Sequence, residues 1–381
     1  MKSKKFLLRL LIMSIPFNEI AVVLPQVRVP TFVFFLYLIV AVPAFKHSYA
    51  KYIKVPLRAL IFLYLALFIT SYLNFFPGYN FGGSFLRQLV IYILFFYFIT
   101  IEFIKGTLTF AEILKAYNNG LFIFLAMALV GIDTTFVDGR LSIMGTNANL
   151  LGVFCVSAVL ITTHLFMKIP QKSGNDLWLF FFKITALLAV IASTGSRGAF
   201  ISLMVAVGIY IIFQQQNTIK RFQYTFVAAL VLGLLSALML SSGILAERFF
   251  AEDEDLAGSR TGIWTAALQV LGDNYLTGVG LFAYQKNMEI LMGRAFAVHN
   301  EFLAIFIYSG IIGFSFFIFF VKEIVASILK FYTRFKNPVL VSLMFGVFFT
   351  MFKGGGVFMS INTWFFFSLA YASKYYIPKV S

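Results

Sequence analysis

The sequence contains very little of several residue types that metal-binding and redox proteins use. Its single cysteine, Cys155, stands inside an apolar run, which excludes an intramolecular disulfide and a cysteine-based metal cluster. Histidine occurs only three times, and 12% of the 381 residues are charged, about half the share in soluble domains. We therefore expect no redox chemistry, no cofactor and no metal site.

Apolar residues make up 61% of the sequence, which includes 50 Phe. A soluble fold could not bury so much apolar surface, so we expect the bilayer to be the main solvent of this chain. The net charge of +15 could indicate nucleic acid, but the basic residues lie in loops between apolar runs. That pattern is typical of membrane orientation. Membrane lipids are therefore expected partners, and nucleic acid is not.

Apolar runs of about 17 to 25 residues predict transmembrane helices. The runs lie at about 6–24, 29–45, 57–75, 88–104, 113–132, 150–169, 177–193, 199–213, 224–245, 302–321, 339–352 and 357–372. Those beside Arg197 and Gly354 are short for a span. We expect an all-α integral membrane protein in which residues 1–381 form a single polytopic domain of about twelve transmembrane helices.

Most of the 30 Lys and Arg residues fall in alternate loops, beginning with the N-terminal "MKSKK". The positive-inside rule places these loops and both termini in the cytoplasm. The first apolar run has no small-residue cleavage site, so it predicts a retained helix rather than a signal peptide. Arg197, Arg260 and His299 then face the extracytoplasmic side. The same rule places Lys51, Lys172 and Arg334 in the cytoplasm.

Residues 246–301 form a predicted outer loop that is longer than all the others. The loop includes the acidic run 252–255, and "RTGIWTAALQVL" then has the period of an amphipathic helix. We expect that helix near the outer membrane–water boundary. Long loops on membrane scaffolds often carry active sites. The predicted apolar face consists of Ile263, Trp264, Ala267, Leu268 and Leu271.

Arg197 stands in the short segment "STGSRGAF" between two apolar runs. An arginine at the bilayer centre costs roughly 2.5 to 3.5 kcal/mol, so we expect a turn near the interface. Small residues let an anionic group approach the backbone, and the guanidinium fork suits phosphate. We expect Arg197 to bind an anionic substrate, and snorkelling to lipid headgroups is the alternative.

Three other predicted outer segments carry residues of the same chemistry. Arg140 precedes a helix start that contains Asn147 and Asn149, which are natural helix caps. Arg260 begins the predicted amphipathic helix, and His299 directly precedes an apolar run. A histidine, with an ordinary pKa of about 6.5, can remove a proton from a sugar hydroxyl.

Each of these residues also has a purely structural interpretation. Arg140 could pair with Asp133 or Asp138, and Arg260 could pair with the acidic run 252–255. His299 could simply cap the helix that follows it. These alternatives stay open on the sequence alone.

Several segments resemble the bacterial O-antigen ligase and O-antigen polymerase superfamily. They are "STGSRGA", "GSRTGIWTAALQVLGDNYLTGVG", "VHNEFLAIFIYSGIIG" and, more weakly, "RLSIMGTNANLLG". Ten residues separate His299 from Gly310, as in the family pattern. Eleven residues separate Arg140 from Gly152, rather than the ten of one polymerase pattern. The resemblance covers the second half of the chain.

The resemblance implies a GT-C-like fold in the bacterial inner membrane and a metal-independent, inverting glycosyltransferase with its active site on the periplasmic side. The donor would be an undecaprenyl-pyrophosphate-linked oligosaccharide. Arg197, Arg260 and Arg140 would bind its pyrophosphate or glycan, and His299 would be the catalytic base that activates the acceptor hydroxyl. A chain-length regulator protein is a further expected partner.

Polymerases and ligases of this superfamily share these motifs. We favour a repeat-unit polymerase, whose acceptor is another lipid-linked repeat unit, because nothing in this Phe-rich chain is specific for lipid A-core and polymerases vary widely in sequence. A ligase that joins the polymer to lipid A-core is the alternative. A lipid-linked sugar transporter or flippase is a further alternative, which would need ionisable groups at mid-membrane, and Glu19 is the clearest candidate.

Overall fold

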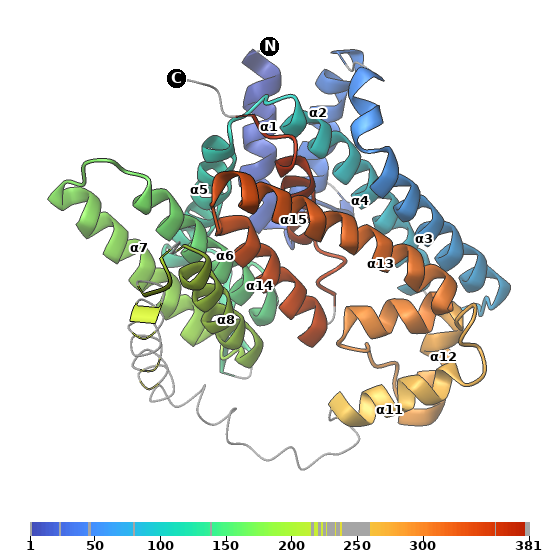
Figure 1. Ribbon diagram of the computed structural model, residues 1–381. Coiled ribbons are helices and arrows are strands. Elements are labelled where there is room, and N and C mark those ends of the chain that lie inside the picture. Colours follow the sequence, from blue (N-terminus) through green and yellow to red (C-terminus); the bar gives the residue numbers. More distant parts are fainter. Residues whose placement is uncertain are drawn as a thin grey trace.

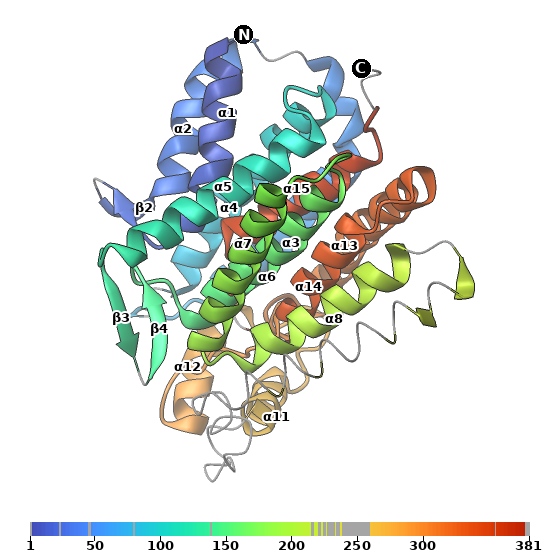
Figure 2. The ribbon, with the colours of Figure 1, turned by 90° about the vertical axis from the view of Figure 1, so that its left-hand side faces the viewer.

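Helices that run between two opposite ends of the molecule dominate the computed structural model (Figure 1). Both termini lie at one end, and α11 (Arg260–Leu271) and α12 (Gly280–Met292) lie at the other, in both views (Figures 1 and 2). We call these the terminal end and the distal end. The structure describes residues 2–377 except 23, 45–46, 79–80, 138, 215–216, 220–221, 224–225, 227–232, 234–236, 238–259 and 355.

Within the described residues, six helices are long and apolar enough to cross a membrane. They are α3 (Lys54–Leu73), α4 (Phe81–Ile104), α6 (Ala148–Met167), α7 (Gly174–Ser193), α8 (Arg197–Gln214) and α13 (Glu301–Phe335). The other helices are α1 (Lys2–Ser14), α2 (Val29–Ala41), α5 (Phe110–Leu129), α14 (Val339–Lys353), α15 (Ile361–Ser373) and the short 3₁₀ helices η1 (Ile15–Phe17), η2 (Val42–Ala44) and η3 (His47–Tyr52). The predicted helical membrane fold is confirmed, whereas the number of about twelve spans is not. The predicted span 224–245 lies almost entirely outside the described residues.

The first predicted span, 6–24, is not one continuous helix. α1 ends at Ser14, next to η1 with its Pro16, and the antiparallel hairpin β1 (Ala21–Val22) and β2 (Leu24–Arg28) follows. At about 1.5 Å per residue, α1 and α2 are each roughly 20 Å long, which is shorter than the bilayer core of about 30 Å. A second hairpin, β3 (Thr134–Val137) and β4 (Arg140–Ile143), joins α5 to α6. The hydropathy pattern predicts neither hairpin.

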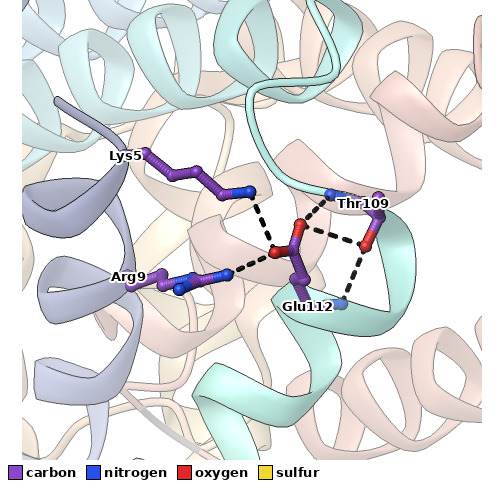
Figure 3. A network of polar contacts seen from close by, with 4 residues as sticks. All are labelled: Lys5, Arg9, Thr109 and Glu112. Atoms are coloured by element: carbon purple, nitrogen blue, oxygen red, sulfur yellow. Dashed lines mark hydrogen bonds and ion pairs between the residues drawn. The ribbon is translucent and has the colours of Figure 1, made fainter. Parts of the chain in front are cut away.

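Ion pairs fix α1 to the start of α5. Lys5 Nζ lies 3.0 Å from Glu112 Oε1, and Arg9 also donates to that oxygen (Figure 3). The other carboxylate oxygen of Glu112 accepts from the backbone N–H of Thr109 at 2.8 Å, and the Thr109 side chain accepts from the Glu112 N–H. This reciprocal capping box begins α5 and positions the carboxylate for the two cations.

α13 is interrupted at Gly310, where φ is 61°. At the interruption, the N–H of Ile311 donates to the Tyr275 carbonyl at 2.8 Å instead of continuing the helix. A Cβ at position 310 would collide with the Leu276 carbonyl. Glycine is therefore required here both for the backbone conformation and for the close approach of the α11–α12 segment.

Aromatic packing holds α15 against α4 and α13. The Trp364 ring is fully buried, with ring centroids 6.0 Å from Tyr92 and 6.1 Å from Phe320. Its Nε1 donates to the carbonyl of Phe358 at 2.7 Å. The core thereby anchors the 354–360 loop, which joins α14 to α15 and contributes to the site described next.

Candidate active site

The predicted tight turn around Arg197 is confirmed. α7 ends at Ser193, α8 begins at Arg197, and Gly195 between them has φ 55°. Ser196 Oγ accepts from the Ala199 N–H at 3.2 Å, which satisfies one of the free donors at the start of α8. Arg197 is half-buried as the first residue of that helix.

Arg140 holds this turn against α6. Its Nε donates to the Thr194 carbonyl at 3.0 Å, and its Nη2 donates to Asn149 Oδ1 at 2.7 Å. Ser196 Oγ donates to the same Asn149 oxygen at 2.9 Å. Asn147 caps α6 as predicted, with its side chain accepting from the Asn149 N–H. Asp138, an alternative partner of Arg140, lies outside the described residues.

A cavity of about 290 Å³ lies among these elements and the starts of α11 and α13. We call it the cationic cavity. Three helices, α6, α8 and α11, begin at its wall, so their N-terminal N–H groups add partial positive charge to it. The surroundings therefore favour an anion. Its polar lining consists of Glu19, Asn147, Asn149, Ser196, Arg260, His299, Thr350 and Lys353.

Two of the predicted residues, Arg260 and His299, line this cavity directly. Arg197 lies between two lining residues, Ser196 and Gly198, and its charge acts on Lys353 of the same wall, whereas Arg140 lies behind the turn. The acidic run 252–255, an alternative partner of Arg260, lies outside the described residues. The structure thus brings three of the four predicted residues to one place and gives Arg140 a supporting position.

Lys353 is a cation of the site that sequence reasoning missed. It ends α14 and lines the cationic cavity, where the charges of Arg260 and Arg197 both act on its ammonium group. Three cations this close repel one another, and a bound polyanion would relieve that repulsion. The segment "KGGG" between two short apolar runs combines a basic residue with small residues, as the Arg197 turn does, and that likeness could have indicated the site.

Glu19 lies in the turn after η1, outside any helix. Its carboxylate accepts from Asn18 Nδ2 at 2.9 Å and lies 3.7 Å from Arg28 Nη2. Arg28 partly offsets its negative charge at the wall of the cationic cavity. The residue that best supported a transporter is therefore not an ionisable group inside a spanning helix.

His299 adopts a left-handed backbone conformation with φ 53°, which histidine tolerates better than most residues. Asn300, not His299, caps α13, because its Oδ1 accepts from the Leu303 N–H at 3.1 Å. The alternative that His299 is a helix cap is therefore wrong. Partial burial, and secondly the charge of Arg260, lower the pKa of His299 below its usual 6.5, so the ring is neutral at neutral pH.

A second cavity, of about 400 Å³, meets the first at His299. We call it the side cavity. It lies between α4, α13 and the 354–360 loop. None of the described residues that line it is Lys or Arg, so its polar groups are neutral donors and acceptors apart from Glu301. These polar groups belong to Ser84, Gln88, His299, Asn300, Glu301 and Tyr308.

Glu301 fixes the loop that lines both cavities. Its buried carboxylate accepts from the backbone N–H of Phe358 at 3.3 Å and from those of Gly356 and Val357. A buried carboxylate with these partners holds backbone in place. These hydrogen bonds to the loop engage the carboxylate of Glu301, which is two residues from His299 in the chain.

α11 confirms the predicted helix in "RTGIWTAALQVL", with one correction to its face. Ile263, Ala267 and Leu271 are buried as predicted, but Leu268 is 49% exposed, and Val270 is buried instead. The reason is that α11 packs on α12 and α13, which shifts its buried face. Of the described residues, no group of three or more His, Cys, Asp or Glu is placed to hold a metal ion.

Residues 181–318 match the family model of the O-antigen ligases. The predicted resemblance to the O-antigen ligase and polymerase superfamily is confirmed. The superfamily match includes the Arg197 turn, α11 and the His299 segment, which form part of the wall of the cationic cavity. An uncharacterized protein of Haemophilus influenzae is 26% identical over 208 residues. The alignment covers 49% of this chain and 50% of that protein, so the chain matches about half the length of this curated relative.

Proposed function

We propose that the protein is a repeat-unit polymerase of the bacterial inner membrane, an inverting glycosyltransferase whose site faces the periplasm. The observation that carries this proposal is the meeting of two cavities at one neutral histidine. The cationic cavity suits a pyrophosphate, and the side cavity suits a neutral sugar. Residues of the superfamily match line part of each cavity.

The donor in this proposal is an undecaprenyl-pyrophosphate-linked oligosaccharide, with its pyrophosphate in the cationic cavity. Arg197, Arg260 and Lys353 provide three fixed charges there, and three helix N-termini add to them. Arg140 keeps the Arg197 turn in place rather than binding the anion. The polyprenyl tail would extend into the surrounding lipid.

The chemistry proposed is a direct displacement. The acceptor hydroxyl oxygen attacks the anomeric carbon from the side cavity, His299 takes the hydroxyl proton, and the bond from the anomeric carbon to the pyrophosphate oxygen breaks. The electron pair leaves with the pyrophosphate, whose developing charge the cations stabilise. Inversion at the anomeric carbon follows because nucleophile and leaving group occupy opposite sides of that carbon.

A ligase that uses lipid A-core as acceptor is the second candidate, because the matched family model carries the description of O-antigen ligase. The two activities share a donor and differ only in what enters the side cavity. A volume of about 400 Å³ admits one or two sugar rings of either acceptor.

Purified protein incubated with synthetic lipid-linked repeat units tests the activity, with and without lipid A-core. The polymerase proposal predicts a ladder of lengthening lipid-linked products without lipid A-core. Transfer only when lipid A-core is present would assign the ligase, and no transfer in either mixture would contradict both. Liposomes that move the labelled lipid without chain growth would assign a transporter.

Single-cysteine labelling in a Cys155→Ala background tests the sidedness. Leu268→Cys, on the exposed face of α11, should react with an impermeant reagent added outside, and Lys172→Cys should not. Reaction of position 172 from outside would place the site on the wrong side for this donor.

A further inference from the structure

A cavity of about 750 Å³ that is distinct from the two cavities of the site lies between α3 and α4 and close to η3. Its walls are apolar along most of their length, where Ile61, Val90 and Leu94 face outward. Lys51, Lys54 and Arg58 line it as well. We call it the α3–α4 groove. It opens to the side of the helix bundle, where lipid surrounds a membrane protein.

The three cations gather at the terminal end of this groove. Lys51 belongs to η3, Lys54 begins α3, and Arg58 lies one turn further along the helix. All three side chains are exposed, and the Lys51 ammonium lies 5.1 Å from the Tyr52 ring centroid. No carboxylate is among the described residues that line the groove. The local charge is therefore strongly positive.

The dimensions of the groove match one leaflet. From Lys54 to Tyr64, the deepest residue of its α3 wall, the helix rises about 15 Å at roughly 1.5 Å per residue. Half of a hydrocarbon core of about 30 Å is the same length. A lipid with its headgroup at Lys51, Lys54 and Arg58 would therefore lay its acyl chain along the whole apolar wall.

We propose that the α3–α4 groove binds one anionic phospholipid from the leaflet at the terminal end. Three cations around one phosphate provide the charge complementarity, and the apolar wall provides the contact with the chain. Another cavity at the terminal end, lined by Lys115, Lys168 and Lys183, also contains the Asp176 carboxylate and is less suited to an anion.

Native mass spectrometry of the full chain in detergent tests this proposal, with phosphatidylglycerol or phosphatidylcholine of identical acyl chains as the probe. We expect one retained phosphatidylglycerol at concentrations where phosphatidylcholine leaves no adduct. Equal retention of the two lipids would overturn the proposal, because the cations would then select nothing.

Variants separate the groove from general surface charge. Lys51→Gln/Lys54→Gln/Arg58→Gln should weaken phosphatidylglycerol binding by roughly five-fold per cation removed. The matched control Lys172→Gln/Lys330→Gln/Lys336→Gln removes the same charge from other loops and the last part of α13, and should change binding less than two-fold. Equal losses in the two triples would contradict a defined site.

A substitution in the apolar wall tests the contact with the acyl chain without changing any charge. Leu94→Trp fills the groove without altering a cation, and it should weaken binding of the long-chain lipid while the protein elutes and melts as the wild type does. Unchanged binding in Leu94→Trp would show that the chain lies elsewhere and would overturn the proposal. Retention of glycerol phosphate without acyl chains would overturn it too.

Discussion

The indole Nε1 of Trp264 donates a 2.8 Å hydrogen bond to the carbonyl oxygen of Val298, the residue before His299. Trp264 lies one turn into α11, the helix that begins at Arg260. The same ring packs edge-on against Phe352 at 6.5 Å, next to Lys353. One side chain therefore sets the spacing of a candidate base and two candidate pyrophosphate ligands.

Replacing Trp264 by Phe should keep the apolar packing and lose the hydrogen bond. A hydrogen bond of this kind contributes about 0.5 to 1.5 kcal/mol, so we expect a loss of up to roughly ten-fold in kcat and a drop of no more than a few degrees in melting temperature. Steady-state transfer rates and melting curves of purified Trp264→Phe check this. A wild-type kcat would show that the bond does not position His299.

The guanidinium groups of Arg197 and Arg260 should not be replaceable by ammonium groups. Lysine keeps the charge but loses the planar fork that holds two phosphate oxygens at once. Arg197→Lys and Arg260→Lys should each lower the transfer rate on the order of 10²- to 10³-fold. Arg294→Lys, on the loop after α12, is the matched control and should leave the rate unchanged. Near-normal rates in both site variants would reduce these arginines to lipid anchors.

Lys353 should strengthen donor binding and, through charge repulsion, lower the stability of the substrate-free protein. Lys353→Gln removes one of three repelling charges, so it should raise the melting temperature without substrate while it weakens the donor. We expect KM for the lipid-linked donor to rise on the order of ten-fold, because a hydrogen bond to a charged group is lost. A lower melting temperature together with an unchanged KM would remove Lys353 from the site.

Apolar runs predicted most helix positions, and small residues predicted the Arg197 turn, because both features depend only on residues that are neighbours in the sequence. Neither hairpin was predicted. Residues 20–24, at the start of the β1–β2 hairpin, are apolar, and hydropathy does not distinguish a strand from the end of a transmembrane helix. Lys353 escaped because only tertiary packing brings the end of α14 to Arg260. Asn300 took the capping role from His299, although the two are adjacent, because backbone conformation decides which side chain reaches the Leu303 N–H.

The pH dependence of transfer should have its acid limb below pH 6.5. A base must be neutral to accept a proton, and activity falls as pH drops through the pKa of His299, which burial and the charge of Arg260 lower from 6.5. Removing the Arg260 charge should raise that pKa. The residual activity of Arg260→Gln should therefore begin to fall at a higher pH than that of the wild type as the pH is lowered. An identical limb in the two proteins would show that another group titrates.

The transfer rate of His299→Gln, measured on purified protein with synthetic lipid-linked repeat units, tests most directly whether His299 is the base where the two cavities meet. Glutamine retains hydrogen-bonding capacity but cannot accept the proton at neutral pH. Asn300 keeps the helix cap, so the variant should fold and insert normally. We predict a rate lower by about 10²- to 10⁴-fold at normal protein levels. A variant that retains most of the wild-type rate would contradict the assignment of the base and of the site built around it.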